Sequence, residues 1–166
     1  MRQSISKNQN DISGLPKITL ITCGYKDIKQ TYPNIEHIII DDVTPPVAFN
    51  AGLKSSTNSI CCFLDNKSNF LSEYVVEDVL KTFLRYPEFG GIYTDNIFNG
   101  HRQYYPSYSY QTLQTIIINT PFFCRRETNI EFDETNLDNY YYDILKKMGQ
   151  FTILHHIPEA LFTIDI

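Results

Sequence analysis

The chain has 166 residues, of which 42% are hydrophobic and 20% charged, a composition that predicts one folded domain and excludes an extensively disordered protein. Its net charge of -5 and its 14 scattered Lys and Arg residues exclude a broad basic face, so we expect no binding to nucleic acid. No apolar run is long enough to span a bilayer, and the polar start of the chain lacks a secretory signal pattern, which predicts a cytoplasmic protein.

The start of the chain, residues 1–15, is polar and ends at the turn-forming residues Gly14 and Pro16. We therefore predict a flexible N-terminal segment over residues 1–15. A regular pattern begins immediately after it, so residues 16–166 are expected to form the folded domain.

Apolar runs and helical patterns alternate through the first half of this domain. Buried strands are predicted over residues 18–23, 36–42, 59–65 and 91–95, the last being shorter than the others. Helices are predicted over residues 44–56 and 72–85. Strands and helices that alternate with short connections indicate a parallel sheet with right-handed crossovers.

The second half is less regular. Asn99-Gly100 lies between two strand-like segments and predicts a two-residue hairpin, which makes the sheet mixed rather than purely parallel. The remaining expected elements are a short helix or strand at 113–118, a strand at 122–124, a helix at 137–148 and two strand-like pieces at 151–155 and 161–164. The fold class is therefore α/β, with a mainly parallel, mixed central sheet flanked by helices in one Rossmann-like domain.

The chain has four cysteines, none of them in a C-x-x-C pair, and three lie inside apolar runs. Buried reduced thiols are the favoured interpretation, and disulfides or metal ligands are the alternatives. The four are Cys23, Cys61, Cys62 and Cys124.

Three predicted strands run directly into aspartate, at Asp41-Asp42, Asp65 and Asp95. Parallel strands of an open α/β sheet present their carboxyl ends along one edge, where ligands bind, so these carboxylates could converge on one site. Ribose hydroxyls, base N–H groups or a divalent cation beside phosphate would suit them. The alternative is that each aspartate only caps the next turn.

The order of segments resembles the GT-A glycosyltransferases of the family 2 type, which transfer a sugar from a nucleotide diphosphate to an acceptor. The phrase Gln30-Thr31-Tyr32-Pro33-Asn34-Ile35-Glu36 resembles that family's lead into its second strand. Three further segments are similar to its A-x-N-x-G helix motif, its D-x-D strand and the strand after it; they are 48–53, 60–65 and 91–95. Shorter phrases later in the chain extend the resemblance to about residues 16–162.

The resemblance implies a GT-A-like domain over residues 16–166 that binds a nucleotide sugar, with a UDP-sugar as the default donor and a glycan or other hydroxyl as acceptor. It implies donor contacts from Gly24, Tyr25, Asp42, Asn50, Asp65 and Asp95. It also implies a Mn²⁺ or Mg²⁺ ion, for which Asp65 would be the ligand.

The sequence departs from the family pattern in several places. About a dozen residues separate the first two strands, so the helix expected there is lost or reduced to a turn, and an extra strand between Asp42 and Asn50 has no room. The third position of the D-x-D triplet is Lys67, and an ammonium group cannot ligate a metal. Either Lys67 neutralises the diphosphate itself, giving metal-independent catalysis, or the site is inactive.

The catalytic base of the acceptor side is also displaced. Alignment puts Tyr140-Tyr141 where the family has its acidic pair, and Asp138 is the nearest carboxylate that could accept the proton of the acceptor hydroxyl. The alternative for Asp138 is a helix N-cap. Of His155 and His156, at most one could face a site, because adjacent strand residues point to opposite sides. A tyrosine cluster could stack on sugar rings or pack a loop; its members are Tyr104, Tyr105, Tyr108 and Tyr110.

Two functions from different classes remain. One is a glycosyltransferase, and the other is a catalytically inactive GT-A-like module that binds or scaffolds. A Rossmann oxidoreductase is excluded, since no G-x-G-x-x-G follows the first strand.

Overall fold

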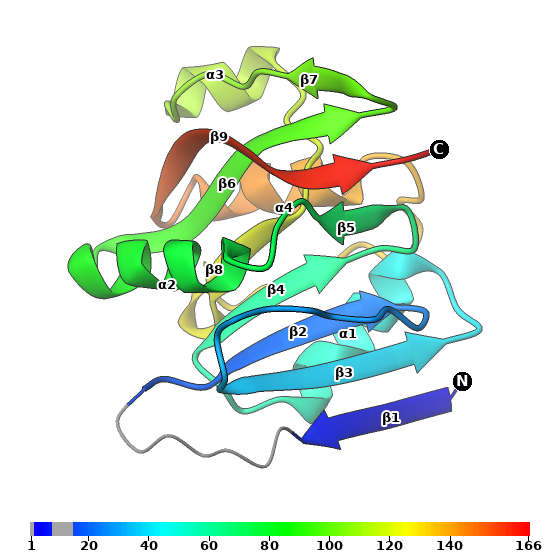
Figure 1. Cartoon of the computed structure of the whole chain (residues 1–166). Helices are drawn as coiled ribbons and strands as arrows, with labels where there is room; N and C mark the ends of the chain where they lie inside the picture. The colour runs from blue at the N-terminus through cyan, green and yellow to red at the C-terminus, as the bar shows by residue number, and fades with distance from the viewer. Residues whose placement is uncertain (1, 8–14) are drawn as a thin grey trace.

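The computed structural model of the protein describes residues 2–7 and 15–166, which form one mixed sheet of nine strands with helices on both faces (Figure 1). The strands are β1 (Arg2–Lys7), β2 (Ile18–Cys23), β3 (Ile35–Asp41), β4 (Ile60–Leu64), β5 (Ser68–Phe70), β6 (Phe89–Phe98), β7 (His101–Gln103), β8 (Phe122–Arg125) and β9 (Ile153–Ile164). The helices are α1 (Pro45–Ser55), α2 (Val75–Arg85), α3 (Tyr110–Thr115), the 3-10 turn η1 (Arg126–Thr128) and α4 (Tyr140–Met148).

The strand order is β1-β3-β2-β4-β8-β6-β9-β5, and β7 pairs with β6. Strands β2, β3 and β4 are parallel neighbours, and β6 runs in the same direction because the antiparallel strand β8 lies between it and β4. Strand β9 is parallel to β6. The predicted mixed α/β sheet is thus confirmed, and the long strands present their carboxyl ends along one edge, on the right in Figure 1.

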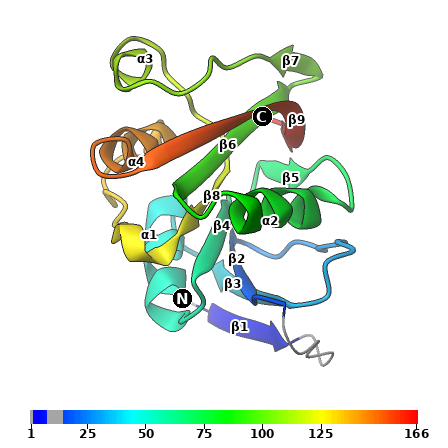
Figure 2. The same cartoon turned by 90° about the vertical axis from the view of Figure 1, so that its left-hand side faces the viewer.

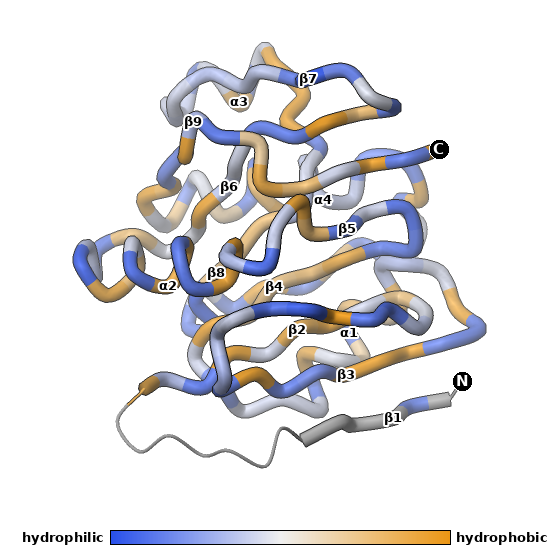
Figure 3. The backbone as a smooth tube through the Cα atoms, in the orientation of Figure 1, coloured by the Kyte–Doolittle hydropathy of each residue, from blue (hydrophilic) through white to orange (hydrophobic). Residues whose placement is uncertain are grey.

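Two apolar layers hold the helices against the sheet. Helices α1 and α4 lie on one face and α2 on the other, as the view along the sheet in Figure 2 shows. Alternate residues of β2 enter the two layers: Ile21 packs with α1 and α4, whereas Leu20 packs with α2. Both faces are covered, which explains why β2, β3 and β4 are buried along nearly their whole length. Along α2, hydrophobic and hydrophilic positions alternate, as Figure 3 shows, and the buried ones face the sheet.

The first strands, the first two helices and the Asn99-Gly100 hairpin were predicted within a few residues of their observed bounds. As expected, residues 24–34 form no helix, and no strand lies between Asp42 and Asn50. The loop 24–34 is instead fixed by its own polar side chains. Gln30 accepts a bond from the Val76 N–H at the start of α2, at 2.9 Å, and so takes the place of an N-cap.

Three predictions differ from the structure. The segment 1–15 was expected to be flexible, but Arg2–Lys7 form β1, which pairs antiparallel with β3; residues 1 and 8–14 lie outside the described residues. A polar strand suits this position because it covers the edge of β3 without needing an apolar face of its own. The strand predicted over 91–95 is the ten-residue β6, and the two last pieces are one strand, β9.

The sequence pattern did not predict β9 as one strand because Pro158 interrupts the run of strand-forming residues. The register with β6 shifts at this point, from Ile157 opposite Thr94 to Ala160 opposite Asp95, so Pro158 sits in a bulge. A proline is tolerated in a bulge because no ladder bond needs its missing N–H. All four cysteines are buried free thiols, which confirms the favoured interpretation. Among the described residues, no helix has the length and apolarity to cross a membrane.

Candidate functional site

The carboxyl ends of β2, β3 and β4 meet at one edge of the sheet. The last two residues of β2 pair with Ile40 of β3 and Leu64 of β4. Gly24, Asp42 and Asp65 follow these paired positions, so the structure brings three of the sequence-predicted residues to the same edge.

The backbone at this edge turns sharply. Gly24 has a φ of +85° and Asp42 a φ of +62°, both in the left-handed region. The Gly24 N–H bonds to the Ile40 carbonyl at 2.9 Å, which keeps the two turns together. The Asp42 side chain is exposed, and Figure 3 shows the change from hydrophobic to hydrophilic where β3 ends. Tyr25, also predicted for the donor, is 75% exposed on the loop that follows Gly24.

Asp65 is buried at the end of β4, with only 4% of its surface exposed. One carboxylate oxygen accepts a bond from the Tyr140 hydroxyl, and the other accepts the Lys67 backbone N–H at 3.1 Å. Its own N–H donates to the Tyr141 hydroxyl at 2.9 Å. Burial and the Asp65 charge raise the pKa of both tyrosines, so both hydroxyls stay protonated. These bonds attach the start of α4 to the end of β4.

Asp138 lies next to this contact, because α4 begins at Tyr140. The N-cap of α4 is Asn139, whose side chain makes no capping bond, so Asp138 is not the cap. Its side chain is exposed, and its carbonyl accepts the Asn119 side-chain N–H at 3.3 Å. Among the described residues, the buried oxygens Asn119 Oδ1 and Thr120 Oγ1 have no hydrogen-bond partner. Asp138 and Asp65 thus flank one helix start, with unused polar oxygens nearby.

Two lysines lie at this edge, and they differ in what holds them. Lys67 is exposed, and its hydrogen bonds come from its backbone: the N–H to Asp65 and the carbonyl to the Asp165 N–H at 3.0 Å. Lys26 is half-buried, and its ammonium donates to the Asn66 carbonyl at 3.3 Å and to Asn69 Oδ1 at 3.4 Å. The sequence reasoning considered only Lys67.

A divalent cation does not fit the residues at this edge as they are arranged. Within the described ranges, no three His, Cys, Asp or Glu side chains gather in a group that could hold a metal ion. Both oxygens of Asp65 already accept hydrogen bonds, and the third position of the triplet is a lysine. We therefore derive no step through a metal.

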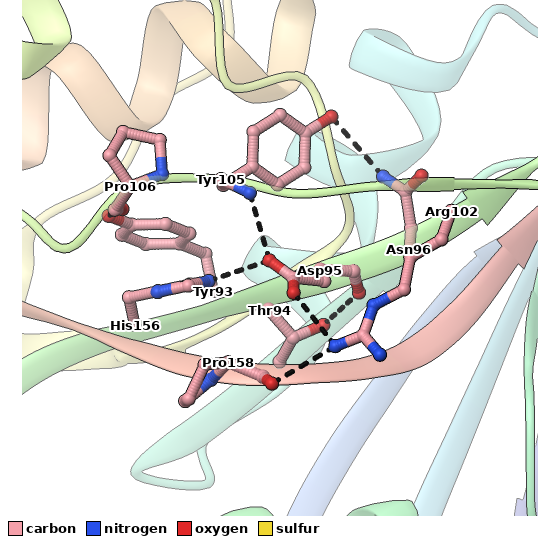
Figure 4. Close-up of polar contacts among 9 residues, drawn as sticks. All are labelled: Tyr93, Thr94, Asp95, Asn96, Arg102, Tyr105, Pro106, His156 and Pro158. Atoms are coloured by element: carbon pink, nitrogen blue, oxygen red, sulfur yellow. Dashed lines mark hydrogen bonds and ion pairs between the residues drawn. The ribbon is translucent and has the colours of Figure 1, made fainter.

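Asp95 lies at the same level of the sheet as Asp65. Its polar contacts are with a separate cluster of residues around β6, which Figure 4 shows. Its Oδ1 accepts the Tyr105 N–H at 2.9 Å and contacts the His156 ring at 2.8 Å, and its Oδ2 pairs with Arg102 at 3.1 Å. Arg102 also donates to the Pro158 carbonyl at 3.1 Å. With 2% of its surface exposed, Asp95 has its charge compensated inside the protein.

The other candidates have structural partners. Asn50 is buried in α1, and its amide makes two bonds to the Phe132 backbone, to the N–H at 2.8 Å and the carbonyl at 2.9 Å. It therefore holds the 130–135 segment rather than the strand ends. His156 faces Asp95, whereas the His155 ring stacks on Phe89 at 4.5 Å, so the two histidines point to opposite sides as expected.

The tyrosine cluster is divided between packing and exposure. Tyr105 packs against the core, and the Tyr108 hydroxyl donates to the Gly149 carbonyl at 2.6 Å. Tyr104 is 74% exposed and lies under the Arg102 guanidinium, while Tyr110 is 53% exposed. Two of the four rings are therefore free to meet a ligand.

Sequence reasoning missed Lys26 and the role of the two tyrosines of α4, and it named Cys23 only as a buried thiol. Tyr140 and Tyr141 had been placed by alignment at the position of an acidic pair, and that substitution was the available signal. Burial, followed by Asp65 and Asp41, raises the pKa of the Cys23 thiol to about 11, so it remains protonated at neutral pH. Nothing local marked Lys26, because its contacts are with residues 40 or more positions away.

Solved structures share the fold of this chain. The fold resembles residues 1–349 of S. aureus TarS, with a TM-score of 0.70 and 13% identity over 90% of this chain and 60% of that chain. The same protein in complex with UDP-GlcNAc gives a TM-score of 0.68 at 12% identity, over 90% of this chain and 58% of that one. The mannosyltransferase PcManGT from Pyrobaculum calidifontis, in complex with GDP-Man and Mn²⁺, gives 0.61 at 13% identity, over 93% and 57%.

These neighbours are glycosyltransferases, and the chain has a GT-A-like fold. The expected fold is thereby confirmed in a shortened form, since the chain spans about 60% of the length of the TarS structure. No protein-family model and no curated protein matches the sequence.

Proposed function

We propose that this chain binds a nucleoside diphosphate sugar, with UDP-sugar as the default donor, across the carboxyl ends of β2, β3 and β4 and transfers the sugar to a hydroxyl acceptor such as a glycan. The observation that carries the proposal is the GT-A-like fold over 90% of the chain, together with Gly24, Asp42 and Asp65 at its ligand-binding edge. A neighbour of the same fold is solved with UDP-GlcNAc.

The proposed chemistry needs a base and a positive charge. Asp138 would take the proton of the acceptor hydroxyl as its oxygen bonds to the anomeric carbon, while the bond from that carbon to the diphosphate breaks. The nucleoside diphosphate leaves with an extra negative charge, which an ammonium group at the edge would stabilise without a metal. The exposed carboxylate of Asp138, two residues before the Tyr140 that contacts Asp65, supports an acceptor position at the start of α4. Four free thiols favour the cytoplasm as the compartment.

The second candidate is a catalytically inactive GT-A-like module. The observation that favours it is the Tyr140 hydroxyl bonded to Asp65, which covers the carboxylate that a donor would approach. Such a module would still bind a nucleotide or a glycan.

One experiment separates the two. The melting temperature is measured with UDP, UDP-GlcNAc, GDP and GDP-Man, each with Mn²⁺ and with EDTA, because a ligand selective for the native state must raise it. Hydrolysis of the same nucleotide sugars is followed in parallel. A metal-independent rise with hydrolysis supports the transferase, and a rise without hydrolysis supports the inactive module. No response to any of the four nucleotides would contradict donor binding altogether.

A further inference from the structure

We propose that Lys26, and not Lys67, supplies the positive charge that faces the diphosphate of the bound nucleotide. The inference rests on the proposed function, since it assigns a residue to the same edge of the sheet. It changes which lysine replaces the metal ion that this class of site would otherwise use.

Lys26 reaches across the edge from the loop after β2 to the turn after β4. Its ammonium lies 3.3 Å from the Asn66 carbonyl and 3.4 Å from Asn69 Oδ1. Both acceptors follow Asp65 closely in the chain, so the positive charge is held over the end of β4. This is the place where a diphosphate would lie if the nucleotide spans β2 to β4.

The Lys26 ammonium forms no ion pair with a described residue. Among the described residues no carboxylate lies within 4.0 Å of its ammonium, and the two acceptors it has are neutral. Burial lowers the pKa of Lys26, and the Asp65 charge opposes this shift. A partly dehydrated cation without an ion pair is a favourable binder of a phosphate anion.

Lys67 lacks these properties. Its side chain is exposed and makes no hydrogen bond or ion pair within residues 15–166, while its backbone N–H makes the bond to Asp65. Any other non-proline residue at position 67 would offer the same N–H. The position of Lys67 in the triplet therefore does not require its ammonium at the site.

Lys26 also borders an open cavity of about 330 Å³ between the loop and β3. The cavity is lined by polar and aromatic side chains, including Tyr25, Gln30 and His37, and by three isoleucines. Its size is at the lower end of the range for ligand pockets. A nucleotide whose diphosphate contacts Lys26 would thus have a hollow beside it for another part of the molecule.

The test compares the affinities of UDP, UMP and uridine by isothermal titration calorimetry in EDTA. Lys26→Met should weaken UDP binding by roughly tenfold to a hundredfold, because a charged hydrogen bond to phosphate is lost, and should leave uridine binding unchanged. Lys26→Arg should retain most of the affinity. The matched variant Lys67→Met should bind UDP within about twofold of the unsubstituted chain, as expected for a solvated side chain. Lys26→Gln, which keeps a donor for Asn66 and Asn69 and removes the charge, should behave like Lys26→Met and covers the case in which that variant misfolds.

The outcomes distinguish this inference from the proposed function. If the unsubstituted chain binds UDP and both neutral variants of Lys26 bind it equally well, Lys26 is not the cation, although the donor site stands. A loss confined to Lys67→Met would return the role to Lys67. If the unsubstituted chain binds none of the three ligands, the proposed function fails, and this inference fails with it.

Discussion

Asp65 and Asp95 occupy equivalent places in the sheet but have different surroundings. Cys62 of β4 and Ile92 of β6 both pair with Phe123 of β8. Each aspartate lies three residues after its paired residue, so the two carboxylates lie at one level on either side of β8. Asp65 has neutral donors, a tyrosine hydroxyl and a backbone N–H. Asp95 has the guanidinium of Arg102 and the ring of His156.

The difference shows that the position of an aspartate at a sheet edge does not by itself define its role. A buried carboxylate needs its charge compensated, and Asp95 receives that compensation from the protein. Asp65 is instead held by two neutral donors, and Lys26 lies at the same edge with its ammonium bonded to Asn66 and Asn69. We therefore propose that Asp95 stabilises the fold and that Asp65 belongs to the donor site.

The largest expected effect comes from Asp95→Ala. It should lower the free energy of unfolding by roughly 3 kcal/mol or more, because it leaves Arg102 and His156 without the buried carboxylate between them. Urea denaturation followed by circular dichroism measures this loss, and the UDP affinity of the folded protein should not change. The matched control is Asp165→Ala, an exposed aspartate, for which a change within about 0.5 kcal/mol is expected. If Asp95→Ala lowers the free energy of unfolding by less than about 1 kcal/mol, the proposal that Asp95 has a stabilising role is contradicted.

A smaller effect is expected from Tyr140→Phe, which removes the hydroxyl bonded to Asp65. The free energy of unfolding should fall by about 1 kcal/mol, the net value of one hydrogen bond. The affinity for UDP should rise, because a carboxylate oxygen of Asp65 becomes free to accept from the nucleotide. Tyr25→Phe, which alters a largely exposed ring, serves as the control for stability. Weaker UDP binding by Tyr140→Phe would indicate that the hydroxyl itself contacts the nucleotide.

The smallest expected effect concerns how steeply the free energy of unfolding falls as the solution is acidified. Burial alone would raise the pKa of Asp95, but the Tyr105 N–H, His156 and Arg102 outweigh it, so the pKa is lowered. A carboxyl with a lowered folded-state pKa contributes stability above its unfolded pKa of about 3.9, and this contribution is lost as the pH falls through the folded value.

The unsubstituted chain should therefore lose stability below about pH 4 more steeply than Asp95→Asn, which has no carboxyl to protonate there. Urea midpoints measured from neutral pH down to about pH 3 test this. The difference in midpoint between the unsubstituted chain and Asp95→Asn should become smaller as the pH falls. Parallel curves would show that the Asp95 charge contributes nothing to the folded state.

The sequence by itself determined the elements whose signal is local. Runs of apolar residues predicted β2, β3 and β4, and helical spacing predicted α2. Asn99-Gly100 predicted the hairpin, and both of these turn residues have the positive φ that the turn requires. The number of residues between the first two strands was enough to show that no helix fits there. The aspartates at the strand ends, and hence the edge that carries the candidate site, could also be located from the pattern alone.

Only the tertiary structure decided what those aspartates do. The partners of Asp95 come from β7, β9 and the loop after β7, and the side-chain partner of the Asp65 carboxylate comes from α4, which begins 75 residues later. The same holds for β1, which is a strand because β3 offers it an open edge, and for Lys26, whose acceptors lie beyond β4. A local pattern records which side chains an element buries. Which distant group compensates a buried charge depends on how the chain folds back on itself, and this is why two similar aspartates acquired different surroundings.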